Sequence, residues 1–316
     1  METQYQNDEL LWVEKYRPKN IENCILPNDL KDQFNAFTEN GIPNLLLSGG
    51  PGVGKTTSAR ALLEQGGYDY IMINGSMNGN IDTLRTDIKN YASTVSLQNT
   101  RKYVILDEAD YLNASTTQPA LRNFMEEYSK NCGFILTCNF KNKILPALQS
   151  RCSTIDFKIS GKEKPRLAMD FLNRLETILD NESVEYDKKV LADLIMKYFP
   201  DWRKVLNELQ RYSSLGKIDT GILTKGDDNE LKDLMGILKK KNFNDMRKWV
   251  AENIDNDCAV VFRKLYDKAH TIMKEPSIPQ LVLIIADYQY KDAFVADHEV
   301  NLVACLTEIM ANCEFK

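Results

Sequence analysis

Apolar runs and helical patterns alternate along the chain between residues 43 and 157. The apolar runs are continuous, which is typical of parallel strands that are covered on both faces of a sheet. We therefore predict an α/β domain with a mainly parallel sheet, and we expect its ligands to bind at the carboxyl ends of the strands. The predicted strands are Leu45–Ser48, Tyr70–Asn74, Tyr103–Asp107, Phe134–Thr137 and Thr154–Phe157, and the predicted helices lie near 55–65, 81–97, 115–129 and 144–149.

After residue 160 the strand patterns stop and the hydrophobic spacing becomes helical. Leu167, Phe171, Leu175 and Ile178, for example, are three or four positions apart, so they lie on one face of a helix. A break that contains Gly221 and Gly226 separates two groups of helices, and we place a domain boundary there. Helices are predicted near 162–181, 187–199 and 201–214 before this break and near 228–241, 243–254, 257–274, 277–290 and 297–314 after it.

Residues 281–286, within the fourth helix after the break, are apolar on every side. A helix that is hydrophobic all round is a buried helix. We expect this one to be covered either within its own domain or by another subunit.

The first domain contains a phosphate-binding pattern at residues 49–56. This stretch fits G-x-x-x-x-G-K-[ST] without a mismatch, and it lies between an apolar run and a helical stretch, as a phosphate-binding loop requires. The glycines allow successive N–H groups to point at a triphosphate, and the helix N-terminus adds its partial positive charge. Lys55 would reach the β and γ phosphates, and the hydroxyl of Thr56 would bind Mg²⁺. The pattern predicts an ATP and Mg²⁺ site.

Two carboxylates follow a predicted buried strand further along the chain, at Asp107 and Glu108. In a phosphate-binding domain, the first acid of such a pair holds the magnesium ion through its water shell, and the second polarises the attacking water. An isolated Asp-Glu pair at a strand end is more often a solvated turn. The intact glycine loop upstream favours the catalytic interpretation.

Composition narrows the remaining classes of function. Of the 316 residues, 43% are apolar and 27% are charged, as in a globular protein. No apolar run approaches the roughly 20 residues that span a bilayer, and the first residues do not form a signal peptide, so we expect no membrane contact and a cytosolic location, or its equivalent in an infected cell. The seven cysteines contain no C-x-x-C pair, which argues against structural zinc and a disulfide framework. A net charge of −5 means that any DNA contact is local.

Five motifs occur in a specific order. They are Trp12–Pro18, the glycine loop, Asp107–Asp110, Thr137–Asn139 and Ser150–Cys152. In that order they resemble the AAA+ ATPase subunits of sliding-clamp loaders of the replication-factor-C type. The length, the stretch 199–204 and the helical last third look closest to the T-even phage branch of that family. The resemblance covers nearly the whole chain after residue 10. The letters Asp-Glu-Ala-Asp also occur in helicases, but the other helicase signatures are missing.

The resemblance implies roles for individual residues. Asn139 corresponds to sensor 1, which orients the attacking water or touches the γ-phosphate; Arg151 corresponds to an arginine finger that enters the site of a neighbouring subunit; and Arg203 corresponds to sensor 2 in the lid. Their structural alternatives are a turn-capping asparagine, a surface arginine and a lid salt bridge. With Lys55 and Glu108, these three make up the implied catalytic set, and Thr56 and Asp107 the implied metal ligands. The implied nucleotide-binding residues are Val13, Glu14, Lys15, Tyr16, Arg17, Ile25, Gly52, Val53, Gly54, Lys55, Thr56, Thr57 and Arg203.

The resemblance implies less about DNA and clamp contacts. Asn80 stands where relatives often carry a basic DNA-contacting residue, which weakens any assignment of a DNA contact there. Arg85, Lys89 and Arg122 are candidates for DNA contact, although exposed helix charges are the simpler interpretation. A clamp-facing site would fall on the helix at 81–97, with Tyr91, Val95 and Leu97 as its anchors, although any amphipathic helix needs such a face for its own core.

The implied architecture is an AAA+ nucleotide-binding domain at 1–159, a helical lid at 160–224 and a helical collar at 225–316 that assembles subunits. The implied function is ATP hydrolysis within a clamp loader: ATP binding opens the sliding clamp and grips primer–template DNA, and hydrolysis releases the closed clamp on the DNA. The implied partners are further copies of this chain, a different clamp-loader subunit, the clamp and the DNA. Two alternatives stay open, namely another AAA+ motor such as a branch-migration ATPase or an unfoldase, and a nucleotide-gated scaffold that binds ATP without hydrolysis.

Overall fold

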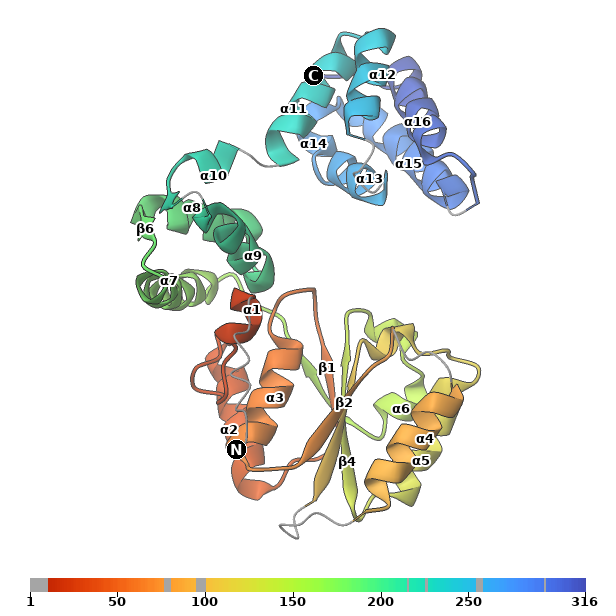
Figure 1. The fold of residues 1–316 in the computed structure, drawn as a ribbon. Coiled ribbons are helices and arrows are strands. Elements are labelled where there is room, and N and C mark those ends of the chain that lie inside the picture. Colours follow the sequence, from red (N-terminus) through yellow and green to blue (C-terminus); the bar gives the residue numbers. More distant parts are fainter. Residues whose placement is uncertain are drawn as a thin grey trace, which may run out of the picture. The chain divides into compact units, whose positions relative to one another are not determined.

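A computed structural model describes residues 11–76, 81–94, 101–214, 216–224, 227–253, 258–292 and 294–316 (Figure 1). The chain divides into two compact units, of which the first ends at Ile222 and the second begins at Leu223. In the described ranges, no helix combines the length and the apolar character needed to cross a membrane. The domain limits predicted near residues 159 and 224 stay predictions.

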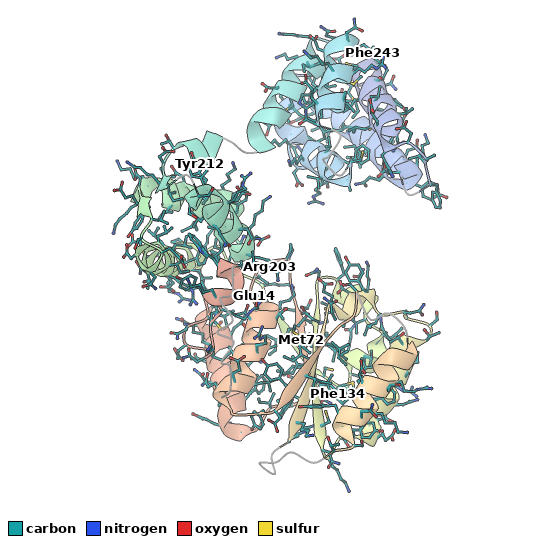
Figure 2. The ribbon with its side chains drawn as sticks, in the orientation of Figure 1. Glu14, Met72, Phe134, Arg203, Tyr212 and Phe243 are labelled. Atoms are coloured by element: carbon teal, nitrogen blue, oxygen red, sulfur yellow. The ribbon has the colours of Figure 1, made fainter. Side chains whose placement is uncertain are left out.

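A five-stranded parallel sheet forms the centre of the first unit, with the strand order β2-β3-β4-β1-β5. The predicted parallel sheet is confirmed. Every residue of β1 and β4 is buried, which explains why their sequences read as continuous apolar runs. β2 is an edge strand, and its Met72 is 50% exposed (Figure 2). The strands are β1 (Leu45–Ser48), β2 (Tyr70–Asn74), β3 (Lys102–Asp107), β4 (Cys132–Cys138) and β5 (Ser153–Asp156).

Helices cover both faces of this sheet (Figure 1). Successive strand residues point to opposite faces, so Leu45 and Leu47 of β1 pack in one core and Leu46 packs in the other. The first face carries α2 (Asn28–Asn40) and α3 (Lys55–Gln65), and the second carries α4 (Ile81–Ala92), α5 (Thr117–Glu127) and α6 (Pro146–Gln149). The helix predicted at 81–97 ends at Ala92.

The N-terminal part of the first unit is more helical than the sequence pattern predicts. α1 (Trp12–Lys15) is a single turn whose Trp12 is buried, and α2 precedes the sheet. The pattern of α2 is weak because its apolar stripe is narrow: Phe34 is fully buried, and only Leu30 and Phe37 join it in the core. Pro27 immediately before α2 lies where a proline is compatible with a helix start.

Three helices, α7 (Lys164–Asn181), α8 (Lys188–Tyr198) and α9 (Trp202–Ser213), follow the sheet. The predicted face of α7 is confirmed, because Leu167, Phe171, Leu175 and Ile178 are buried. The expectation of no further strand is wrong. β6 (Glu185–Tyr186) and β7 (Lys217–Ile218) form a short parallel pair. Two-residue strands are too short to produce an alternating pattern in the sequence. The boundary between the two units falls within α10 (Gly221–Thr224).

The second unit is helical and has its own core. The single helix predicted at 257–274 is wrong, because α13 ends at Asp267, α14 is one turn, and Met273 then pairs with Phe315 in an isolated bridge. In α15 the apolar stretch is buried on one side only, since Leu281 is fully buried and Leu283 is 66% exposed. The helices are α11 (Asp227–Lys239), α12 (Phe243–Glu252), α13 (Cys258–Asp267), α14 (Ala269–Ile272), α15 (Ile278–Asp292) and α16 (His298–Asn312).

Candidate active site

The glycine loop connects β1 to α3, and Lys55 is the first residue of α3. Gly52 and Gly54 have positive φ values of 68° and 95°, which glycine adopts without a steric cost. The Lys55 side chain is buried, and its Nζ donates hydrogen bonds to the carbonyl oxygens of Gly49 (2.9 Å) and Gly50 (2.7 Å) and to Oδ1 of Asn139 (2.8 Å). Burial lowers the pKa of Lys55. The loop, the lysine and Asn139 therefore form one connected group.

The carboxylate of Asp107 lies at the end of β3, facing the start of α3. Its Oδ1 accepts hydrogen bonds of 2.6 Å from the hydroxyls of both Thr56 and Thr137. Thr56 and Asp107 were predicted as metal ligands 51 positions apart, and the fold brings them into direct contact. A hydroxyl and a carboxylate oxygen are hard donors of the kind that Mg²⁺ uses beside water and phosphate, so the pair fits this ion.

Glu108 follows Asp107 in a strained backbone conformation. Its φ and ψ are 56° and 43°, in the left-handed region, and its N–H donates a 3.1 Å hydrogen bond to the hydroxyl of Thr137. A residue with a side chain pays about 1–2 kcal/mol for this conformation. Such strain is concentrated at functional sites. The hydrogen bond to Thr137 attaches this turn to β4, beside the carboxylate of Asp107.

Asp110 fixes the backbone that carries Asn139. It is 6% exposed, and its Oδ2 accepts hydrogen bonds from the backbone N–H groups of Asn139 (3.2 Å) and Phe140 (3.1 Å). The backbone of Asn139 is consequently bound by Asp110, while its side chain contacts Lys55. This arrangement places the amide at the glycine loop and distinguishes it from an asparagine that only caps its own turn.

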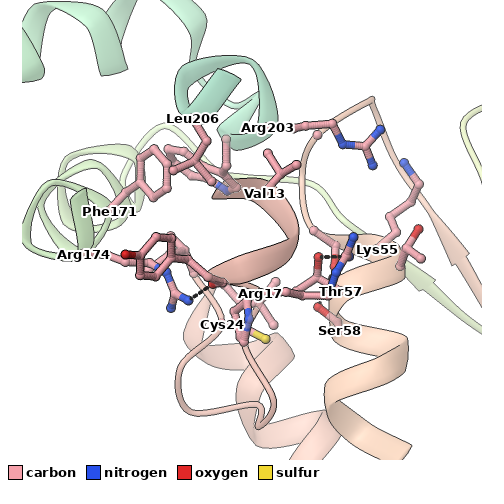
Figure 3. Close-up of a pocket in the computed structure, with 18 residues that line it drawn as sticks. Val13, Arg17, Cys24, Lys55, Thr57, Ser58, Phe171, Arg174, Arg203 and Leu206 are labelled. Atoms are coloured by element: carbon pink, nitrogen blue, oxygen red, sulfur yellow. Dashed lines mark hydrogen bonds between the residues drawn. The ribbon is translucent and has the colours of Figure 1, made fainter. Parts of the chain in front are cut away.

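A cavity lies beside the glycine loop, between the N-terminal segment and the helices α7 and α9 (Figure 3). Ten residues predicted to bind nucleotide line it: Val13, Tyr16, Arg17, Ile25, Gly52, Gly54, Lys55, Thr56, Thr57 and Arg203. The remaining wall was not predicted as a binding surface, and it consists of Pro18, Cys24, Leu26, Ser58, Phe171, Arg174, Trp202 and Leu206.

Three predicted binding residues, Glu14, Lys15 and Val53, do not line the cavity. Val53 is buried in the core. Glu14 accepts a 3.0 Å hydrogen bond from Nε of Arg17, and Arg17 in turn donates one of 3.1 Å to the hydroxyl of Thr57. The hydrogen bond from Arg17 holds the pKa of Glu14 below its ordinary value. Glu14 therefore orients a residue of the wall.

Lys15 is turned away from the cavity towards α7. Its Nζ lies 2.7 Å from a carboxylate oxygen of Glu182, and the hydroxyl of Tyr16 donates to the same oxygen at 2.5 Å. Lys15 and Tyr16 thus tie the N-terminal segment to the end of α7.

Arg174 of α7 closes the cavity on the same side. Figure 3 shows Arg174 at the cavity. Its two terminal nitrogens donate 2.6 Å hydrogen bonds to the carbonyl oxygens of Tyr16 and Asn23. Burial lowers the pKa of Arg174. One guanidinium therefore joins α7 to two points of the N-terminal segment. The spacing of Phe171 and Leu175 marked α7 as a core helix, and no signal in the sequence distinguished Arg174 from an ordinary helix charge.

Arg203 reaches the cavity from the first turn of α9, and Figure 3 shows its side chain approaching that of Lys55. Two contacts attach this turn to the loop. The backbone N–H of Trp202 donates to the carbonyl oxygen of Gly52 (3.2 Å). Asp201, whose Oδ1 caps α9 by accepting from the N–H of Lys204 (2.9 Å), packs directly on Gly52. The start of α9 is therefore set by the glycine loop.

Arg151 does not line this cavity. It follows α6 and pairs with Glu126 of α5, and its side chain is about a third exposed (33%). The arginine-finger role of Arg151 stays a prediction.

The candidates for DNA and clamp contacts have mixed outcomes. Arg85, Lys89 and Arg122, the candidates for DNA contact, are exposed, as such a contact requires. Tyr91 instead packs on its own domain, with its hydroxyl buried and Nζ of Lys102 at 4.7 Å from its ring centre. Asn80, Val95 and Leu97 lie outside the described residues.

The chain matches two protein-family models between residues 45 and 224, and it matches known proteins over nearly its whole length. Residues 45–160 match the family described as "ATPase family associated with various cellular activities (AAA)", and residues 163–224 match "Sliding-clamp-loader large subunit, AAA+ ATPase lid domain". The chain is 34% identical over 309 residues to the sliding-clamp-loader large subunit of Enterobacteria phage T4, which covers 96% of both chains. It is 32% identical over 325 residues to the replication factor C small subunit of Sulfolobus acidocaldarius, which covers 97% of this chain and 98% of the relative.

Among solved structures, a single-residue variant of Thermotoga maritima RuvB matches with a TM-score of 0.54, over 71% of this chain and 80% of that chain. The sequence identity of this pair is 15%, so the likeness concerns the fold alone.

Proposed function

Because the chain belongs to the AAA+ sliding-clamp-loader ATPase family, we infer that it hydrolyses ATP as a subunit of a clamp loader. The observation that carries the ATPase assignment is the connected group of the glycine loop, Lys55, Asn139, Asp107 and Thr56. Transfer of a phosphoryl group to water needs positioning and charge stabilisation more than covalent chemistry, and this group supplies both.

Each member of the group has a proposed role. Lys55 exchanges its contacts with the loop carbonyls for the β and γ phosphates of ATP. Glu108 accepts the proton of the attacking water, and Asn139 orients that water or the γ-phosphate. Thr56 and Asp107 hold Mg²⁺, which neutralises charge on the phosphates when it is bound.

The adenosine moiety is proposed to occupy the cavity beside the loop. The cavity has an apolar wall that suits a purine ring, formed by Val13, Ile25, Phe171 and Leu206. Arg203, at the opposite end of the cavity, suits the phosphates. Since α7 and α9 supply part of this wall, bound nucleotide contacts the lid as well as the sheet domain. The proposed division of the chain is a nucleotide-binding domain at 1–159, a lid at 160–224 and a collar at 225–316.

Arg151 is proposed to complete the nucleotide site of a neighbouring subunit. A guanidinium supplied in trans stabilises the charge of the transition state. A subunit that needs its neighbour's arginine is nearly inactive alone, so the working form is an oligomer of several copies of this chain with a different clamp-loader subunit. In that oligomer, ATP binding is proposed to open the sliding clamp and grip primer–template DNA, and hydrolysis to release the closed clamp. The cytosolic location stays a prediction.

The test is steady-state ATP hydrolysis by the chain with its partner subunit, with and without primer–template DNA and a sliding clamp. The proposal expects strong stimulation that needs both DNA and clamp. Arg151→Ala should abolish this stimulation while ATP still binds. Hydrolysis that ignores the clamp and rises with DNA length would instead identify a translocating motor of the branch-migration type.

Glu108→Gln separates the ATPase from a nucleotide-gated scaffold. It should abolish hydrolysis in the assembled oligomer and leave ATP binding intact, because the amide keeps the shape of the side chain but cannot accept the proton. Unchanged hydrolysis would remove Glu108 from the mechanism.

A further inference from the structure

Arg151 is held in one orientation by two other parts of its own chain. Its Nε donates a 2.8 Å hydrogen bond to Oε1 of Glu126, and one terminal nitrogen donates to the same oxygen. The other terminal nitrogen donates to the carbonyl oxygen of Ala147 at 2.7 Å. These contacts fix both the position and the plane of the guanidinium, because its nitrogens are coplanar.

Both anchors belong to rigid elements. Glu126 lies in the last turn of α5, directly after Phe124 and Met125, which are buried against the sheet. Ala147 lies in α6, and the turn after α6 is closed by hydrogen bonds from the N–H of Arg151 to the carbonyl oxygen of Leu148 (3.0 Å) and from Cys152 to Gln149 (3.2 Å). A side chain held by packed helices is placed more accurately than one on a free loop.

The anchored guanidinium keeps donors for a further partner. Arginine has five N–H donors. Three of them are used in the bonds to Glu126 and Ala147, which leaves one N–H on each terminal nitrogen for which the described residues provide no hydrogen-bond partner. Two such donors on a partly exposed cation are suited to a phosphate group. The hydrogen bond from Arg151 also holds the pKa of Glu126 below its ordinary value, so this carboxylate is charged at neutral pH.

We propose that Glu126 is the positioning residue for Arg151: it holds the guanidinium in the orientation in which its free N–H groups meet the γ-phosphate of the ATP bound by the neighbouring subunit. This inference rests on the proposed function, since it assumes that Arg151 acts in trans. Glu126 keeps its contact while Arg151 binds phosphate, because the two use different N–H groups. It touches no substrate, and it acts only through Arg151.

An ordinary surface ion pair is the alternative, and it makes a different prediction. Exposed pairs contribute little to stability, and their removal changes little else. A positioning residue instead affects the catalytic step, because a misplaced transition-state group costs rate without weakening ground-state binding.

The experiment measures ATP hydrolysis by the chain assembled with its partner subunit, in the presence of clamp and primer–template DNA. Glu126→Ala should lower kcat by about tenfold to a hundredfold, with KM for ATP and the assembled mass unchanged. Glu127→Ala is the matched control, because it removes the same charge from the next position of α5, and it should behave as wild type. If Glu126→Ala does not assemble, Glu126→Gln serves instead; it retains an acceptor oxygen and should show a smaller loss of kcat.

A double-mutant cycle tests whether Glu126 acts through Arg151. If it does, Glu126→Ala causes no further loss when Arg151 is already alanine, whereas independent effects would add and would overturn the inference. If Glu126→Ala has the kcat of wild type while Arg151→Ala is inactive, the inference about Glu126 is overturned and the proposed function is not. Full activity of Arg151→Ala would instead overturn the finger role in the proposed function.

Discussion

The hydroxyl of Thr56 donates a 2.6 Å hydrogen bond to the carboxylate of Asp107, which joins the first turn of α3 to the end of β3. The same carboxylate oxygen also accepts a bond from Thr137 on the neighbouring strand β4. Two hydroxyls therefore hold the carboxylate in place at the carboxyl edge of the sheet. An acid that is already oriented in this way needs little rearrangement to receive a magnesium ion.

Asp107→Asn should separate nucleotide binding from hydrolysis. The amide keeps an oxygen for Thr56 and Thr137 but loses the negative charge that attracts Mg²⁺. We expect ATP to bind with the cavity and the loop intact, while hydrolysis falls by at least about a hundredfold at the usual Mg²⁺ concentration. A titration of Mg²⁺ in the hydrolysis assay and calorimetric ATP binding with and without EDTA would check this. Asp87→Asn, at an exposed position of α4, is the control. An unchanged Mg²⁺ dependence in Asp107→Asn would show that the ion is held by other groups.

Gly52→Ala tests the contact between the loop and the start of α9. A Cβ at residue 52 would lie 1.8 Å from Oδ1 of Asp201, and the φ of 68° is unfavourable for alanine. Relief of the clash displaces Asp201 from its capping position, so we expect a loss of about 2 kcal/mol from the strain and the cap together, with weaker ATP binding. Thermal unfolding with and without ATP measures both effects. Gly50→Ala is the matched control in the same loop, because a Cβ added there would have no atom of the described residues within 4 Å apart from its chain neighbours. Equal melting temperatures for the two variants would contradict the proposed contact.

The sheet and the loop could be predicted because their signals are local. β1 and β2 have the predicted ends, and the glycine pattern with Lys55 and Thr56 is a continuous stretch of chain. The meeting of Thr56 with Asp107 also followed from the sequence, since the carboxyl ends of parallel strands share one edge of the sheet. For Asn139 the family resemblance was needed, because asparagine at a strand end is common in turns.

Apart from Arg203, which the family resemblance supplied, the lid side of the cavity could not be predicted, because its contacts are distant in sequence. Arg174 and the carbonyl oxygen of Tyr16 are 158 positions apart, and Glu182 and Lys15 are 167 apart. A charge on an amphipathic helix is normally solvated, so nothing in the sequence identified Arg174. The two-residue strands β6 and β7 were missed for the different reason that they show no periodicity.

The stability provided by Glu14 should depend on pH in the acidic range. Its hydrogen bond with Arg17 lowers the pKa of Glu14 in the folded protein below that of the unfolded chain, about 4.3. The unfolded chain therefore binds the proton first as the pH falls, so the contribution of Glu14 is fully present above about pH 5 and is lost through the lowered pKa. The free energy of unfolding of Glu14→Gln should be lower than that of wild type at pH 7, and this difference should shrink below pH 4. Urea unfolding across pH measures it, with Glu39→Gln at an exposed site of α2 as the control. A difference that stays constant with pH would exclude this ion pair as its source.

Arg174→Met should disconnect α7 from the N-terminal segment. The change keeps a long side chain but leaves the carbonyl oxygens of Tyr16 and Asn23 without their charged donor, and hydrogen bonds of this type contribute about 1.5–3 kcal/mol each. We expect the free energy of unfolding to fall by about 3–6 kcal/mol and the Kd for ATP to rise by at least about tenfold, because the segment forms one wall of the cavity. Denaturant unfolding and calorimetric titration with ATP measure the two effects. Arg211→Met, which removes an exposed arginine from α9, is the matched control and should leave both quantities near wild type. Since Arg174 lies away from the phosphate end of the cavity, kcat at saturating ATP should fall much less than kcat/KM. An equal loss in both would place Arg174 in the hydrolysis step and would contradict its assignment to the wall of the cavity.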